Sequence, residues 1–391
     1  MLALHLLFFV ELRDRILHGY PDFTVFYTAA TILRQGLAPQ LYDERTQYRV
    51  QEQFMGSVDS RRGPLPFIHP PFEAVIFVPL AFLHYRDAFV IWDLLNGVAL
   101  FGVAIILRRH LSALRSISPW EFVLGFLAFF PIFLTLLQGQ DSILLLLCCT
   151  LAFNALKKDA DVLAGCWLAM GAFKFQLVIP LALLLVVWGR KRVGLGFSLV
   201  VLALAGVSIL AVGRHGLVRY PEYALQIARL PGWGGVPPEL MPNLRGLVEG
   251  WNLPLSGAFL GSVVLAASVI LLFLAARKGQ PVSGRTLDLR FSLAVVVTGL
   301  VSWHTNAHDL GILILPLAVL ANYWCSLPEA DRRRRLRLLL PALPLLVSPL
   351  WIALWLGVGK LNLLAILLLW WSWEIYRELS KSDYSVAEVM A

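Results

Sequence analysis

Several polar and ionisable side chains lie at the ends of, or inside, long apolar runs of this sequence, where such groups are costly. They occur in short stretches that hold Asp22 and Tyr27, His69, Gln138 with Gln140 and Asp141, Lys174, Asn243 with Arg245, and His304 with His308 and Asp309. Carboxylates and imidazoles can move protons, amides can bind sugar hydroxyls, and an ammonium can bind phosphate as a point charge. The set therefore suits the handling of a polar group at a membrane surface.

Asp22 is the first candidate, because it follows a short apolar N-terminal segment and precedes the aromatic Phe23. At a membrane surface a carboxylate stays ionised, accepts a proton and still contacts a group embedded in lipid. The alternative is that Asp22 caps a helix that begins at Phe23, by accepting hydrogen bonds from the first backbone amides. The two roles are compatible, since the positive end of a helix dipole also favours an ionised carboxylate.

Two further stretches stand where apolar runs begin or end. His69 precedes Pro70-Pro71, which fixes an extended backbone before a helix start; it either forms this helix entry or binds a substrate hydroxyl or phosphate. The stretch 138–142 (Gln-Gly-Gln-Asp-Ser) lies between two apolar runs, and its glycine would let a ligand approach the backbone closely. It is either a polar turn or a sugar-binding segment.

Lys174 lies within an apolar stretch and gives the strongest physical signal, because a buried ammonium needs a partner or a cavity unless it snorkels to the interface. His308 and Asp309 could orient each other, and His304 could donate to a phosphate oxygen. The long segment 213–256, which holds Asn243 and Arg245, could form a lid. Two histidines four positions apart without a third ligand predict no metal site, and no motif indicates a cofactor.

Composition places the chain in a membrane. Of its 391 residues, 58% are hydrophobic and only 15% are charged, an excess that must be buried in lipid. Eleven apolar runs predict an all-α polytopic membrane protein of about ten to twelve transmembrane or half-spanning helices, in a single integral domain over 1–391. We expect the run 162–188 to be interrupted at Gly171–Lys174. The segment 1–10 is too short to span, and is either the end of a longer span or a short anchor.

Charge predicts the orientation of these runs. Of the 33 Lys and Arg residues, 19 lie in short loops or in the tail 377–391, which we assign to the cytoplasm. The same bias explains the net charge of +8 and the arginine run 332–335 without a nucleic-acid partner. The segments 11–71 and 213–256 then share the extracytoplasmic side, provided that 72–84 enters the membrane and returns.

The first of these loops has structure of its own. Apolar residues from Phe23 to Leu33 recur at helical spacing up to Gly36 and Pro39, which predicts an amphipathic helix in the membrane interface. Asp43 can cap a second, more polar helix that runs to about Met55, and an exposed loop over 56–66 follows.

In these stretches the chain resembles glycosyltransferase family 87, a branch of the GT-C superfamily. The resemblance covers roughly residues 20–320 and rests on the order of Asp22-Phe23, Phe26-Tyr27, Ala29-Ala30, Gly36, Pro39, Leu41-Tyr42-Asp43, His69-Pro70-Pro71-Phe72, Pro79-Leu80, Trp92, Gln138-Gly139-Gln140, Ala164-Gly165, Lys174 and His308-Asp309-Leu310. It departs from the family at His69, where Tyr is frequent, at Asp141-Ser142, where Asn is frequent, and at Phe175, where Pro is frequent.

The resemblance implies a multi-span GT-C-like enzyme of the plasma membrane, active on its extracytoplasmic face. Such an enzyme takes a hexose, often mannose, from a polyprenyl-phosphate carrier and adds it to a glycan or glycolipid acceptor. It also implies that Asp22 is the base; we further expect an inverting displacement in which Lys174 and His304 or His308 stabilise the departing phosphate. The compact loops suit a bacterial inner membrane.

Three alternatives remain open from the residues themselves. A transporter or flippase of a lipid-linked or small polar substrate would place polar residues at the bilayer midplane and show repeat symmetry. An acyl or phospho-group transferase could use a histidine, and a relative without activity would keep the fold alone. Radiolabel transfer from a polyprenyl-phosphate sugar, compared with an acyl-coenzyme A donor, separates the two transferase classes.

Overall fold

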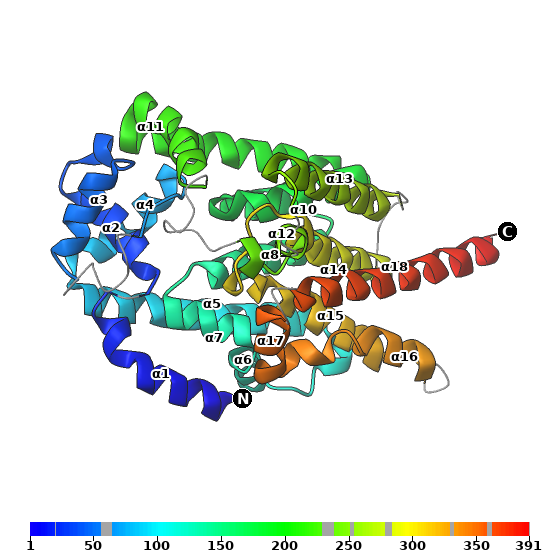
Figure 1. The fold of residues 1–391 in the computed structure, drawn as a ribbon. Coiled ribbons are helices and arrows are strands. Elements are labelled where there is room, and N and C mark those ends of the chain that lie inside the picture. The colour runs from blue at the N-terminus through cyan, green and yellow to red at the C-terminus, as the bar shows by residue number, and fades with distance from the viewer. Residues whose placement is uncertain are drawn as a thin grey trace.

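The computed structural model describes residues 1–19, 21–55, 65–228, 238–250, 254–277, 284–328, 332–357 and 362–390. Every regular element within these ranges is a helix, and no strand occurs there (Figure 1). This confirms the predicted all-α class. The long apolar runs form helices because each satisfies its own backbone hydrogen bonds, which lipid cannot do.

The helices follow the predicted apolar runs, with several short elements between them. The α-helices are α1 Leu2–Leu17, α2 Phe23–Arg34, α3 Glu44–Glu52, α4 Pro71–Phe77, α5 Tyr85–His110, α6 Pro119–Leu127, α7 Phe130–Gln138, α8 Ser142–Leu156, α9 Asp161–Met170, α10 Phe175–Val187, α11 Lys191–Ala228, α12 Leu244–Glu249, α13 Gly257–Ala276, α14 Gly284–Val301, α15 Ile314–Cys325, α16 Arg332–Leu339, α17 Ser348–Leu356 and α18 Leu363–Met390. Short 3₁₀ segments include η3 Val78–Phe82, η5 Ala172–Lys174 and η7 His308–Leu313.

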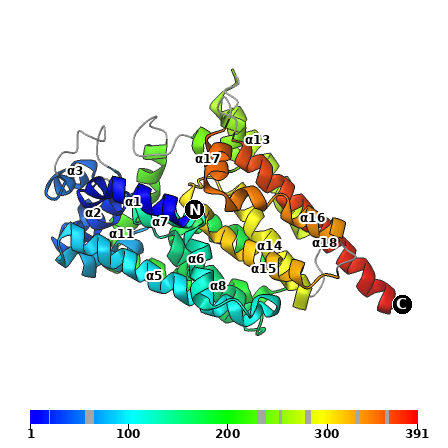
Figure 2. The ribbon, with the colours of Figure 1, turned by 90° about the horizontal axis from the view of Figure 1, so that it is seen from below.

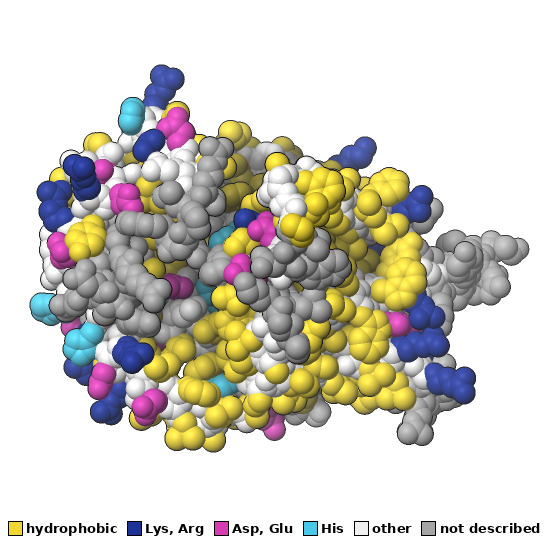
Figure 3. Space-filling model, in the orientation of Figure 1, with side chains coloured by type: hydrophobic (Ala, Val, Ile, Leu, Met, Phe, Trp, Pro, Cys, Tyr) yellow, Lys and Arg dark blue, Asp and Glu magenta, His cyan; other side chains and the backbone are white. Residues whose placement is uncertain are grey.

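Four helical segments among the described residues are long and apolar enough to cross a membrane, and there are six if each of two bent pairs counts as one span. The four are α5, α11, α13 and η7 with α15. On the face shown in Figure 3, a broad hydrophobic area lies between two ends that carry most of the charged side chains. The chain is therefore a multi-pass membrane protein.

The two bent pairs bring polar residues to the ends of apolar helices. The axes of α6 and α7 meet at 77°, and α9 meets η5 with α10 at 68°. The second bend falls at Gly171–Lys174, which confirms the predicted interruption of the run 162–188. Because the helix stops and restarts there, Lys174 stands at the start of α10.

The segments α2, α3 and α4 gather at the opposite end of the molecule from α16 and the C-terminus, as both views show (Figures 1 and 2). Helix α2 begins at Phe23 as predicted, and Asp43 caps α3 by accepting a hydrogen bond from the Thr46 amide at 2.9 Å, also as predicted. The continuous helix of α4 and η3 is about 20 Å long, short of a hydrocarbon core of about 30 Å. On its own it does not reach across such a core, and its return to the same side of the membrane stays a prediction.

Helix α2 differs from the interfacial helix that its pattern predicts, because ten consecutive residues from Phe23 to Ile32 are buried. Two of its threonines satisfy their hydroxyls locally: the Thr28 hydroxyl donates to the Thr24 carbonyl at 2.6 Å, and the Thr24 hydroxyl donates to the Gly19 carbonyl at 2.7 Å. A threonine face can therefore be packed inside the protein.

The predicted loop 213–256 is largely helical where the structure describes it. Helix α11 continues to Ala228 after a break at Gly213, whose φ of 71° and ψ of 173° favour glycine. The short helix α12 follows near the end of this segment. Most of the predicted loop 56–66 and the stretch 229–237 lie outside the described residues.

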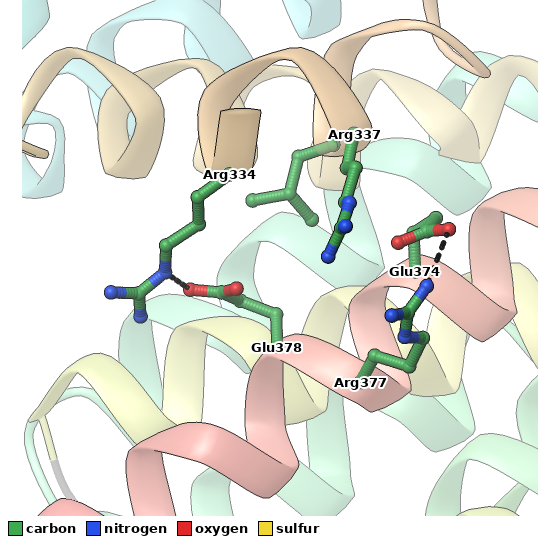
Figure 4. A pocket seen from close by; sticks show the side chains of 6 residues that line it. Arg334, Arg337, Glu374, Arg377 and Glu378 are labelled. Atoms are coloured by element: carbon green, nitrogen blue, oxygen red, sulfur yellow. Dashed lines mark hydrogen bonds and ion pairs between the residues drawn. The ribbon is translucent and has the colours of Figure 1, made fainter. Parts of the chain in front are cut away.

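The arginine run packs on the C-terminal helix. Arg334 donates to Glu378 and to the Tyr323 hydroxyl, while Arg377 pairs with Glu374 at 3.3 Å (Figure 4). The cavity between these side chains measures about 10 Å³, room for about one water. This geometry agrees with an anchor at the membrane end rather than with a ligand site.

Candidate active site

Asp22 lies beside the polar turn that precedes α8. The Gln140 amide donates from Nε2 to Asp22 Oδ2 at 2.9 Å. Although Asp22 occupies the N-cap position of α2, its side chain makes no capping hydrogen bond. The carboxylate is partly exposed and keeps its second oxygen for another partner. The structure therefore shows the N-cap position without the side-chain cap that the sequence suggested.

Gly139 makes this approach possible. It ends α7 in the left-handed conformation, with φ of 62°, and a Cβ there would lie 2.7 Å from the Phe23 Cβ and 2.8 Å from the Phe89 ring. The Trp92 indole fixes the turn by donating to the Gly139 carbonyl at 3.0 Å. A glycine is thus needed both for the turn and for its close packing on the start of α2.

Lys174 is fully enclosed and paired on two sides. Its Nζ lies 3.2 Å from Asp141 Oδ1 and 3.2 Å from Asp309 Oδ1, and its side chain is 5% exposed. A buried ammonium of this kind needs such partners. Snorkelling to the interface, the alternative left open by the sequence, does not occur.

Further hydrogen bonds join the last polar stretch to this centre. The backbone amide of Asn306 donates to Asp309 Oδ2 at 2.8 Å, and the Ser142 hydroxyl donates to Asp309 Oδ1 at 3.2 Å. The His308 ring donates from Nδ1 to Gln138 Oε1 at 2.8 Å, and its Nε2 lies 3.5 Å from Asp309 Oδ1. The structure thus brings together residues that the sequence separates by more than 160 positions.

His69 joins the site through a residue that sequence reasoning missed. Its Nδ1 lies 2.9 Å from Glu73 Oε2, and the Glu73 side chain is 1% exposed. The Tyr42 hydroxyl donates to the His69 carbonyl at 2.8 Å, and the imidazole meets the Phe26 ring edge-on. Glu73 could have been found by the argument applied to Lys174, since it is the only carboxylate within the apolar run 72–84.

Burial sets the protonation of the groups outside the spanning helices. It lowers the pKa of His69 to about 4, with Lys174 acting in the same direction, so the imidazole is neutral and donates its Nδ1 proton to Glu73. Burial likewise lowers the pKa of His304 to about 4. For Asp141, burial raises the pKa to about 7; Lys174 opposes the rise and the nearby Glu73 adds to it.

Other predicted residues have structural partners. The Tyr27 hydroxyl donates to the Leu83 carbonyl at 2.7 Å, and the buried Asn243 caps α12 while its amide donates to the Ser302 carbonyl at 2.8 Å. Arg245 bonds Glu249 at 2.8 Å and lies over the Trp303 ring, 4.7 Å from its centroid. Arg245 therefore lies next to the segment that carries His304, and its positive charge helps to lower the pKa of that imidazole.

The site combines three features. The Asp22 carboxylate is held by the Gln140 amide, and Lys174 is buried between two aspartates. Arg245 and the neutral His304 add hydrogen-bond donors nearby. Such a site can accept a proton from a hydroxyl and stabilise an anionic leaving group. The sequence profile of glycosyltransferase family 87 matches residues 67–304, more than half of the chain. The protein therefore belongs to glycosyltransferase family 87.

A polyprenol-phosphate-mannose-dependent alpha-(1-2)-phosphatidylinositol pentamannoside mannosyltransferase of Mycobacterium tuberculosis (strain CDC 1551 / Oshkosh) is similar to this chain. The two are 28% identical over 210 residues, which make up 52% of this chain and 46% of the relative. The chain thus matches about half the length of that relative. No solved structure matches the present chain. Family membership favours a glycosyltransferase over the transporter and acyltransferase alternatives, and Asp22 precedes the region that the family profile covers.

Proposed function

We propose that this protein transfers a hexose, mannose in the first instance, from a polyprenyl-phosphate carrier to a glycan or glycolipid hydroxyl. The reaction takes place at the extracytoplasmic face of a bacterial inner membrane. The observation that carries the proposal is the Asp22 carboxylate, which is held by Gln140 at 2.9 Å and does not cap its own helix. The similarity to a polyprenol-phosphate-mannose-dependent enzyme supports the choice of donor.

The transfer is a direct displacement with inversion. Asp22 accepts the proton of the acceptor hydroxyl while that oxygen bonds to the anomeric carbon. The bond from that carbon to the carrier phosphate breaks, and its electron pair leaves on the phosphate. The Gln140 amide holds Asp22 in place, so the base needs no reorganisation when the acceptor arrives.

Negative charge grows on the leaving phosphate, and donors placed there favour the transition state over the ground state. Arg245 and His304 are suited to this role, because the neutral imidazole can donate a hydrogen bond and Arg245 is a permanent cation beside it that bonds one carboxylate, Glu249, through Nε. Sequence analysis assigned this role to Lys174 together with His304 or His308. In the structure the Lys174 charge is already shared by Asp141 and Asp309, so its role in the proposal is to hold the two acids together.

Transfer from defined donors tests this proposal. The purified protein in detergent receives radiolabelled polyprenyl-phosphate mannose, polyprenyl-phosphate glucose or a nucleotide sugar, together with a mannoside glycolipid acceptor. We expect polyprenyl-phosphate mannose to label the acceptor faster than either other donor, and the transferred sugar to have the inverted anomeric configuration. Transfer from the nucleotide sugar but from neither lipid donor would overturn the proposed donor, and a retained configuration would overturn the single displacement.

A further inference from the structure

A second constellation lies within the same end of the molecule and is not needed for the proton transfer. His69, Glu73 and Asp141 each offer one ligand-type atom, and these atoms all lie within 4.8 Å of one another. His69 and Glu73 stand at the start of α4, while Asp141 precedes α8. Three side chains from two elements therefore converge on one point.

The two carboxylates of this constellation have too few partners. Glu73 and Asp141 are each 1% exposed, and Glu73 Oε1 and Asp141 Oδ2 accept no hydrogen bond from any described residue. Their ligand-type oxygens lie within 4.8 Å of each other, so the two carboxylates face one another at close range. Buried carboxylate oxygens without a donor are expensive, so something positive must lie between them or one must carry a proton.

The charged groups around the cluster are also unbalanced, because negative groups outnumber positive ones. Glu73, Asp141 and Asp309 supply three carboxylates, whereas Lys174 supplies one ammonium, and that ammonium already lies 3.2 Å from both aspartates. His69 contacts the cluster through one atom, Nδ1, which lies 2.9 Å from Glu73 Oε2 and leaves Glu73 Oε1 without a partner. Asp309 also accepts hydrogen bonds from the Ser142 hydroxyl and the Asn306 amide. Glu73 and Asp141 are therefore the two carboxylates whose negative charge has the least compensation.

We propose that His69, Glu73 and Asp141 bind one divalent cation of the oxygen-preferring class, Mg²⁺ or Mn²⁺. Two carboxylates and one imidazole suit such an ion better than a soft metal. The 2.9 Å between His69 Nδ1 and Glu73 Oε2 is also a spacing that two neighbouring ligands of one small cation adopt at ligand distances of about 2.1 Å. The ion would then take the place of the proton between these two atoms, with the His69 proton on Nε2, and Glu73 Oε1 and Asp141 would complete the protein ligands.

The role of the ion in the transfer rests on the proposed function, whereas its binding does not. Bound beside Lys174, it would supply positive charge for the donor phosphate that Lys174 itself cannot. The competing explanation is a single proton shared by Glu73 and Asp141. The two are distinguished by direct binding measurements made without donor or acceptor.

The test uses Mn²⁺ as the probe. Wild-type protein treated with a chelator is titrated with Mn²⁺, and free Mn²⁺ is followed by electron paramagnetic resonance. We expect saturable binding of one ion per chain, and pulsed measurements should show coupling to an imidazole nitrogen that His69→Gln removes. Glu73→Gln and Asp141→Asn should lose the site, whereas Asp14→Asn, at an exposed carboxylate, should keep it.

Thermal unfolding completes the design, because a variant could lose the ion by misfolding. In chelator, Glu73→Gln should unfold at the same temperature as the wild type or higher, since the amide supplies the missing donor. Mn²⁺ should raise the unfolding temperature of the wild type but not of Glu73→Gln. Wild type without stoichiometric binding, or undiminished binding in both Glu73→Gln and Asp141→Asn, would overturn the proposal. Binding with full transfer activity in chelator would support the site and separate it from the reaction.

Discussion

Gln140 Nε2 donates to Asp22 Oδ2 at 2.9 Å, and so joins the start of α2 to a turn 118 positions later. The neighbours of both residues are fixed independently, because Gly139 packs on Phe23 and the Trp92 indole holds the Gly139 carbonyl. The position of Asp22 is therefore set by the packing of three helices rather than by its own loop.

Gln140 should act as a positioning residue for Asp22. Gln140→Leu removes the amide and should lower kcat about tenfold, with KM changed less. Gln140→Glu keeps the size but places a second carboxylate near the first, which opposes ionisation of the base. The acid limb of its pH–rate profile should therefore move to higher pH. Equal pH profiles in the wild type and Gln140→Glu would show that the contact does not serve the base.

Gly139→Ala should disturb the same contact through the backbone. The added methyl group would meet Phe23 and Phe89 at under 3 Å, and alanine is strained at φ of 62°. We expect a loss of at least about 1 kcal/mol in stability together with reduced transfer. Gly36→Ala is a matched control, because Gly36 also has a positive φ, 73°, but a Cβ there meets nothing within 4 Å. An equal loss of activity in the two variants would contradict the packing argument.

Lys174→Met should destabilise the protein strongly. It leaves Asp141 and Asp309 buried without their cation, which typically costs about 3–5 kcal/mol. Arg219→Met is the control, since Arg219 and Glu222 form an exposed pair that is worth about 1 kcal/mol or less. Thermal unfolding in detergent measures both. Similar unfolding temperatures for the two variants would mean that the buried lysine contributes no more stability than the cation of the exposed pair.

His304 should make the protein sensitive to acid. Its pKa is about 4 in the folded protein, below the ordinary 6.5, because burial opposes the charged form. The unfolded state then binds more protons between these two values, so the stability that neutral His304 contributes is present above about pH 6.5 and is lost as the pH falls toward about 4. His304→Gln should flatten the decline of the unfolding temperature over this window. An unchanged slope would exclude the contribution.

Local signals predicted the parts of the fold that are decided locally. The cap at Asp43, the stop after Arg34 and the break before Lys174 each depend on neighbouring residues, and each appears in the structure. The burial of α2 did not follow from its pattern. The hydroxyls of Thr24 and Thr28 bond to backbone carbonyls of the same chain segment, and the pattern of residue types does not show this.

The site was predicted as a set of residues but not as a geometry. Sequence reasoning found Asp22, Gln140, Asp141, Lys174 and Asp309, yet it could not show that Lys174 lies between two aspartates. Glu73 was not singled out, although it is the only carboxylate within the apolar run 72–84. These pairings depend on how distant helices pack, and no local spacing encodes that packing.

The most direct test of the account is the initial rate of sugar transfer from polyprenyl-phosphate mannose in wild type, Asp22→Asn and the control Asp14→Asn. Asparagine keeps the shape of Asp22 and an oxygen for Gln140 but cannot accept the acceptor's proton. We predict that Asp22→Asn remains folded and loses about 10²–10⁴ in kcat, whereas Asp14→Asn keeps the wild-type rate. A wild-type rate in Asp22→Asn would contradict the central claim that this carboxylate is the base.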